Sequence, residues 1–464
     1  MKRLFVLISI LIFLFSLSLG VFYFKERVLY LDSAYAVFNL INNGFPAIEH
    51  GRYSFYLLEI FPWLGLKLGF TIPTVLALFS ISHILLAFIS FGILLKIKQP
   101  KLALLLTVFQ VLSYRESYFL ALNETSLLIS ASLLLAGFLV FFEDKKHSLL
   151  SSMIVFLILI SITLFCHPMA ILILPFIVFT HWVFLNYKLS LNLKIVSILM
   201  VSILALKILL IPDSDYENKL YFQLSSTFDI ALHLKLVYSF NFFYGDLRIN
   251  SYFIMVYFIP TACFIILAII FFKQKKYVFL ITYVSYVFIL WTLIIVVFNK
   301  GDGNIFMEKN FTPWVIICLY PIVLCEIKYN KFSLILLISV VFYSFFGIFK
   351  VSNIYINRYE ALDKLLTQNY TKNNKLLIND SLINHEEMQG TWALPYETLL
   401  LSKIKKIPKT TIRVYKNEPK INKELNRNDI FLGADFMAVL PATYLLNQNY
   451  FELEKTTYLI ITNQ

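Results

Sequence analysis

The sequence predicts an all-α polytopic membrane domain of about eleven transmembrane helices, followed by a small C-terminal α/β domain outside the membrane. The first observation is composition, because 59% of the residues are hydrophobic and only 15% are charged, whereas charged residues make up about 25% of a soluble globular protein. The second is a series of long apolar runs through residues 1–350. The third is a fall in hydropathy over residues 351–464. A soluble globular fold is therefore excluded.

The apolar runs predict the membrane spans. A helix needs roughly 20 mostly apolar residues to cross the hydrocarbon core of a bilayer. The first run could instead be a signal peptide, because Met1-Lys2-Arg3 precedes it and small residues occur near Ser18 and Gly20. Its length favours a retained helix. The expected spans lie near residues 4–24, 71–95, 101–118, 124–142, 148–166, 168–186, 194–212, 250–272, 277–298, 311–327 and 331–350.

The loops between these spans predict the orientation, since Lys and Arg are retained in the cytoplasm. Basic residues occupy alternate short loops, at Lys2-Arg3, Lys96/Lys98/Lys101, Lys145-Lys146, Lys188/Lys194, Lys273/Lys275/Lys276 and Lys328/Lys331. The remaining loops are longer and acidic, so residues 25–70 and the C-terminal domain are expected on the outer side. The bias toward Lys, Ile, Asn and Phe indicates a bacterial plasma (inner) membrane, with a periplasmic or extracellular C-terminal domain.

The net charge of +12 is divided between these topology signals and a tail rich in Lys and Asn. Anionic lipid headgroups, rather than nucleic acid, are the expected partner. The four cysteines lie in or at the ends of spans and lack the spacing of a disulfide framework or a metal site. The outer domain is therefore expected to be held together by packing.

Residues 351–464 show the pattern of a small α/β domain. Short strands are expected at KLLIND, TIRVY, DIFLGA and TYLIIT, and helices at YETLLLSKIKK and EALDKLLTQ. No nucleotide-binding loop, metal site or nucleophile motif is present in this segment. The catalytic residues are therefore expected in the membrane domain.

The first outer loop, residues 25–70, contains two amphipathic stretches. In LDSAYAVFNLINNGF, apolar residues from Leu31 to Ile41 recur at helical spacing, and a second stretch follows at SFYLLEIFPWLGLKLGF. Both predict helices that lie along the membrane surface. Asp32 would then meet a substrate whose reactive group lies at the level of the lipid headgroups.

This loop resembles that of the C-type glycosyltransferases (GT-C), in the protein mannosyltransferase-like branch that uses polyprenyl-phosphate sugars. The resemblance rests on Asp32-Ser33-Ala34-Tyr35 after the first span, then Gly44, then Glu49-His50-Gly51-Arg52-Tyr53. The second outer loop, SYRESYFLALNETS, also resembles the family's second loop. The resemblance implies an enzyme that transfers a hexosyl or pentosyl group to a lipid-linked glycan, a surface polymer or a protein. Ser33 replaces a frequent acidic residue, so neither a divalent metal nor another cofactor is indicated.

Transfer from a lipid phosphate with inversion needs a base on the acceptor side and positive charge on the phosphate side. Asp32 is the expected base, because partial desolvation at the membrane edge would raise its basicity, and Glu116 is the second catalytic candidate. Candidates for binding the donor phosphate are Arg52, Arg115, Lys207, Arg248 and His167. Candidates for binding the acceptor are Tyr35, Glu49, His50 and Glu124.

Several of these candidate residues could instead have a purely structural role. Asp32 could cap the helix that follows it, and Lys207 could snorkel to the interface. Glu116 and Glu124 could be solvated residues at span ends, and His167 could be structural.

Two other functions are compatible with the composition. A transporter or flippase for lipid-linked oligosaccharide would show internal repeats or paired charges near mid-membrane, and neither is evident. A glycan polymerase or ligase would place its chemistry in a large late loop, for which residues 213–249 are available.

Overall fold

The structure is a computed structural model. It describes residues 2–46, 48, 51–112, 114–143, 147–184, 188–211, 254–297, 304–324, 330–370, 373–415, 427–433, 443–444 and 446–461. Three predicted site residues, Glu49, His50 and Arg248, lie outside the described residues.

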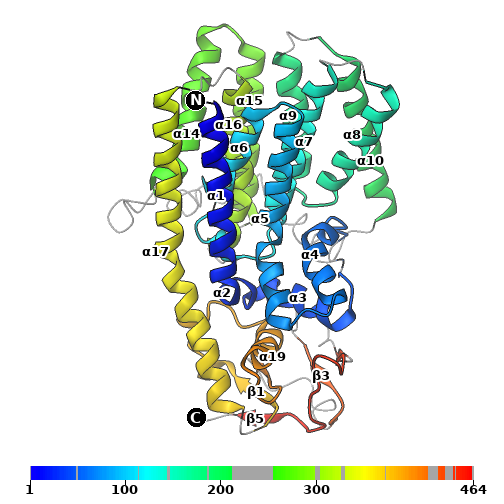
Figure 1. The fold of residues 1–464 in the computed structure, drawn as a ribbon, viewed down its shortest axis with the longest axis vertical. Coiled ribbons are helices and arrows are strands. Elements are labelled where there is room, and N and C mark those ends of the chain that lie inside the picture. Colours follow the sequence, from blue (N-terminus) through cyan, green and yellow to red (C-terminus); the bar gives the residue numbers. More distant parts are fainter. Residues whose placement is uncertain are drawn as a thin grey trace.

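A bundle of long apolar helices forms most of the molecule (Figure 1). Every predicted span overlaps one of its helices over the described residues, although the bounds differ, as for the span predicted at 101–118, whose helix ends at Leu112. The helices are α1 (Lys2–Phe22), α5 (Ile72–Lys96), α6 (Pro100–Leu112), α7 (Glu124–Glu143), α8 (Leu149–Leu164), α9 (Ala170–Phe184), α10 (Leu191–Leu210), α14 (Ile254–Lys273), α15 (Tyr277–Val297), α16 (Asn304–Leu324) and α17 (Lys331–Asn369). Over the described ranges, five are long and apolar enough to cross a membrane, namely α1, α5, α7, α10 and the Ser333–Asn369 part of α17. The membrane character is supported, and the number of eleven spans stays a prediction.

Large apolar side chains cover the outside of this bundle. Leu209 and Ile208 on α10 are 79% and 72% exposed, and Phe342 on α17 is 69% exposed. Monomeric soluble proteins rarely expose contiguous apolar surface on this scale. In a bilayer the same side chains contact lipid, and the helices satisfy their own backbone hydrogen bonds. The exterior of the bundle therefore suits a hydrocarbon environment.

Helix α17 connects the bundle to the C-terminal domain. Its 39 residues span roughly 58 Å at 1.5 Å per residue, about twice the thickness of a hydrocarbon core. In Figure 1 it runs along the bundle and continues to the strands near the C-terminus. The helix predicted at EALDKLLTQ is present, as the last part of α17, which continues from the bundle without a break. The domain boundary predicted at residue 351 falls inside the same helix.

The C-terminal domain is built on a small parallel sheet. Strands β1 (Lys375–Asn379), β2 (Thr411–Tyr415) and β5 (Leu459–Ile461) pair in the order β2-β1-β5. Helices α18 (His385–Met388) and α19 (Leu394–Lys405) lie between β1 and β2 in the chain. A second, antiparallel pair joins β3 (Phe431–Leu432) to β4 (Thr443–Tyr444). The structure confirms the four predicted strands and the α19 helix, and it adds β4.

The first outer loop folds into α2 (Phe24–Val28), α3 (Leu31–Asn43) and α4 (Phe55–Lys67). These helices lie at the same end of the molecule as the C-terminal domain, opposite the N-terminal end of α1 (Figure 1). The prediction that α3 lies on the membrane surface is wrong, because only Asn43 of its residues is exposed. The ring of Phe38, for example, packs within 5.5 Å of the rings of Tyr396, Phe431 and Phe451. The apolar face of α3 is thus covered by the C-terminal domain.

Helix α4 retains apolar exposure. Tyr56 and Leu64 are exposed on α4, and Leu68 and Phe70 are exposed just after it. This pattern agrees with the interfacial position that the sequence predicts for the second stretch.

Candidate functional site

Asp32 lies in the first turn of α3, where the outer loop meets the bundle. The N-cap of α3 is Tyr30, and no side chain makes a capping hydrogen bond there, so Asp32 does not act as the N-cap. Its side chain is partly buried. Within the part of the chain that the structure describes, no hydrogen bond or ion pair engages this carboxylate. Asp32 is therefore available to accept a proton.

Burial raises the pKa of Asp32 to about 6. The nearby positive charges of Lys309 and Arg52 oppose this rise, and the negative charge of Glu124 reinforces it. Desolvation disfavours the charged form of a carboxyl group, so the Asp32 carboxylate is a stronger base than an exposed aspartate. The increase in basicity expected from the sequence agrees with this environment.

The charges beside Asp32 form a compact ion-paired group. Arg52, in the turn before α4, bonds through Nη1 to Glu124 Oε1 at 2.9 Å. Lys309, near the start of α16, pairs with the other oxygen of the same carboxylate. The three side chains are 12%, 4% and 6% exposed in the order Arg52, Glu124 and Lys309. Glu124 therefore holds two cations in position, and it is not the solvated residue of the structural alternative.

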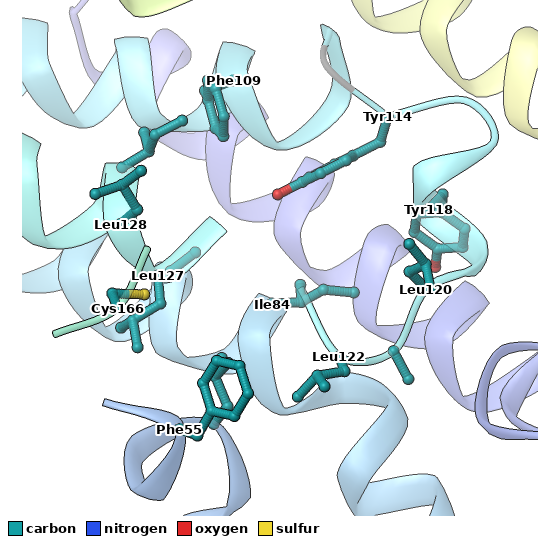
Figure 2. Close-up of a cluster of buried hydrophobic side chains, with 14 of the residues drawn as sticks. Phe55, Ile84, Phe109, Tyr114, Tyr118, Leu120, Leu122, Leu127, Leu128 and Cys166 are labelled. Atoms are coloured by element: carbon teal, nitrogen blue, oxygen red, sulfur yellow. The ribbon is translucent and has the colours of Figure 1, made fainter. Parts of the chain in front are cut away.

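An apolar wall lies behind this group. Figure 2 shows Cys166 beside Leu127 and Leu128, the residues of α7 that follow Glu124 by less than two turns. The thiol of Cys166 donates to the backbone carbonyl of Glu124 at 3.0 Å. An apolar environment lowers the local dielectric and strengthens interactions between charges. The attraction between the cations and a nearby negative charge is therefore stronger here than it would be in water.

His167 follows Cys166 in the turn between α8 and α9. Its Nδ1 accepts a hydrogen bond from the backbone N–H of Met169 at 3.2 Å. Burial, together with the positive charge of Arg52, lowers the pKa of His167 to about 3. The imidazole is thus neutral at physiological pH and contributes hydrogen bonding instead of charge.

Lys207 lies in the last turn of α10, and its Nζ donates to the backbone carbonyl of Leu164 at 2.9 Å. Leu164 is the last residue of α8, where a cation is favourable near the helix C-terminus. Lys207 also acts on the pKa of His167, so it extends the positive charge toward the Asp32 group. The roles of Lys207 in phosphate binding and in snorkelling to the interface both stay predictions.

Arg115 and Glu116 belong to a second ion-paired group, in the turn that contains η1 (Ser117–Phe119). Arg115 Nη2 bonds to Glu116 Oε1 at 2.6 Å. The carboxylate of Glu308 accepts from the backbone N–H groups of Arg115 at 2.6 Å and Ser117 at 3.0 Å. Burial raises the pKa of Glu116. The charges that act on Asp32 are Lys309, Glu124 and Arg52. The two predicted catalytic residues, Asp32 and Glu116, therefore belong to different ion-paired groups.

Tyr35 packs against the C-terminal domain. Its ring centroid lies 5.2 Å from that of Tyr396 and 6.0 Å from that of Trp392, both in edge-on geometry. The predicted role of Tyr35 in acceptor binding stays a prediction.

Lys309 is the site residue that sequence reasoning missed. The available signal was the lysine itself, because basic residues are rare in the acidic outer loops.

The fold and this site define a helical protein whose apolar helices suit a membrane, with a basic carboxylate and paired cations gathered at one end of the bundle. Over the described ranges, no three His, Cys, Asp or Glu side chains gather as a metal-binding group. No family model, curated protein or solved structure matches the chain.

Proposed function

We propose that the protein is an integral membrane glycosyltransferase that moves a sugar from a polyprenyl-phosphate donor to a lipid-linked glycan, a surface polymer or a protein. The reaction takes place on the outer face of the membrane, because the charge pattern of the loops predicts that residues 25–70 lie on that side. The observation that carries the proposal is the Asp32 carboxylate, which has a raised pKa and lies beside the Arg52–Glu124–Lys309 group.

Asp32 serves as the general base. The acceptor hydroxyl attacks the anomeric carbon of the donor, and its proton passes to the carboxylate of Asp32. A base is most effective when its pKa lies near the working pH. A pKa of about 6 keeps Asp32 ionised at neutral pH and makes it more basic than an ordinary aspartate.

Arg52 and Lys309 stabilise the leaving phosphate. As the bond between the anomeric carbon and the phosphate oxygen breaks, its electron pair remains on the phosphate, which gains negative charge. Cations held in position before the reaction stabilise such charge without reorganisation. Arg52 adds the planar geometry that suits phosphate oxygens, and Glu124 keeps both cations oriented. The neutral imidazole of His167 is suited to hydrogen bonding with the phosphate or the sugar.

The location of the site suits this substrate. Exposed apolar residues around α4 favour contact with the outer leaflet. A polyprenyl chain would remain in the bilayer while its phosphate reaches the headgroup level. The donor therefore needs no transfer into water before it reacts.

The experiment reconstitutes the full-length protein in liposomes with a set of radiolabelled polyprenyl-phosphate sugars and lipid-linked acceptors. We expect label to move to an acceptor with release of polyprenyl phosphate, and Asp32→Asn to reduce the rate at least about 100-fold. Lys405→Ala, which removes an exposed ion pair in the C-terminal domain, is the matched control and keeps the wild-type rate. Movement of intact donor between leaflets without bond cleavage would instead establish a flippase and overturn the proposal.

A further inference from the structure

A buried ion pair joins the C-terminal domain to the segment that precedes Asp32. Arg358 belongs to α17 and Glu397 to α19, and their side chains are 2% and 0% exposed. Arg358 Nη2 lies 2.8 Å from Glu397 Oε1 and 2.7 Å from Oε2. A charge pair removed from water to this degree persists only when its hydrogen bonds are well satisfied.

The partners that satisfy it lie directly before Asp32. Arg358 Nη1 donates to the backbone carbonyl of Leu29 at 2.7 Å. Glu397 Oε1 accepts from the backbone N–H of Leu31 at 2.8 Å. The guanidinium group of Arg358 also lies over the ring of Tyr30, 4.6 Å from its centroid. Three consecutive residues before Asp32 are therefore held by this one pair.

The backbone that is held has an unusual conformation. Leu31 has φ +43°, in the left-handed region that a non-glycine residue adopts only when its surroundings require it. Its side chain packs against Gly390, where an added Cβ would lie 2.9 Å from Leu31 Cδ2. The C-terminal domain therefore fixes both the backbone and the side chain of the residue next to Asp32.

We propose that Arg358 and Glu397 are positioning residues, through which the C-terminal domain sets the orientation and the solvent access of the Asp32 carboxylate. The catalytic meaning of this role rests on the proposed function, whereas the positioning itself does not. Within the described residues, the pair makes no hydrogen bond or ion pair to Arg52 or Lys309, so its effect is transmitted through the backbone of residues 29–31.

Two neutral double variants test the hydrogen bond to Leu31. Arg358→Met with Glu397→Gln removes both charges but keeps an oxygen that accepts from the N–H of Leu31. Arg358→Met with Glu397→Leu removes that acceptor as well. Replacing a buried ion pair by uncharged groups of similar volume often leaves stability unchanged or improved, so both proteins are expected to fold. Lys405→Ala is the control, because Lys405 pairs with Asp363 between the same two helices at the surface.

The readout is labelling of Asp32 by an apolar carbodiimide, followed by mass spectrometry as a function of pH in liposomes. Carbodiimides label protonated carboxyl groups, so labelling declines as the pH rises through the pKa. The charged groups that face Asp32, which are Lys309, Glu124 and Arg52, are the same in every variant. We expect a midpoint near pH 6 for the wild type and the control, and a midpoint at least one pH unit lower for the Leu variant. The Gln variant keeps the bond to Leu31 but loses the bond from Arg358 to Leu29, so its midpoint should lie between these two.

A folded Leu variant with the wild-type midpoint would overturn the positioning role. Should the Leu variant fail to fold, Arg358→Met with Glu397→Met supplies the same comparison against Lys405→Ala, because it also lacks the acceptor and leaves no unpaired buried charge. The labelling needs no substrate, so its outcome is independent of the proposed function. Where wild-type transfer is detected, the Leu variant should lose about 100-fold in kcat with an unchanged KM for the donor, as expected when a catalytic group is misplaced.

Discussion

Replacement of Asp32 by Asn is expected to stabilise the protein above pH 6. Burial raises the pKa of Asp32 from 3.8 to about 6, and this difference corresponds to about 3 kcal/mol at most. The folded protein binds the proton more tightly than the unfolded chain does. The contribution of Asp32 to stability is therefore complete below pH 3.8, declines as the pH rises to 6, and stays low above that value.

Asn resembles the protonated carboxyl group at every pH. The free energy of unfolding of Asp32→Asn should therefore equal that of the wild type near pH 4 and exceed it by up to about 3 kcal/mol above pH 6. The measurement is equilibrium unfolding in detergent micelles at several pH values between 4 and 8. Asp363→Asn is the control, because it removes an exposed ion pair and should lower stability by less than about 1 kcal/mol. A stability difference between wild type and Asp32→Asn that is unchanged from pH 4 to pH 8 would refute the reasoning.

Three further predictions concern the same region. The kcat/KM of transfer should rise with pH through about 6, because Asp32 acts as a base only when ionised; a profile that falls over this interval would exclude Asp32 as the base. Glu124→Gln should lower the free energy of unfolding by about 3–5 kcal/mol, because it leaves two buried cations without their carboxylate. Adding Lys309→Met should restore part of that loss, and an additive double variant would argue against the pairing. Gly390→Ala should destabilise the protein by about 1–3 kcal/mol, because φ is +119° and the new Cβ would meet Leu31; wild-type thermal stability would contradict the packing described there.

Local patterns were sufficient to predict most of the fold. Long apolar runs predicted the bundle helices, and short apolar runs predicted four strands of the C-terminal domain. The continuation of α17 beyond residue 350 also had a local signal, since no Gly or Pro occurs between residues 348 and 369. The surface position predicted for α3 was wrong because its apolar face is buried by residues more than 300 positions later in the chain.

The candidate site could be predicted in part. Asp32 was chosen for its place after the first span, and the structure brings it together with the predicted residues Arg52, Glu124 and His167. The pairing of Glu124 with two cations depends on how separate helices meet, which no local pattern contains. The contact between Glu397 and Leu31 joins residues 366 positions apart, so it could be found only in the folded structure.

The most direct test of the account is a single-turnover comparison of wild type and Asp32→Asn with a bound polyprenyl-phosphate sugar and excess acceptor. Donor binding is measured separately, so that loss of chemistry is distinguished from loss of affinity. We predict that Asp32→Asn binds the donor with unchanged affinity and transfers the sugar at least about 100-fold more slowly. Equal single-turnover rates in the two proteins would contradict the account.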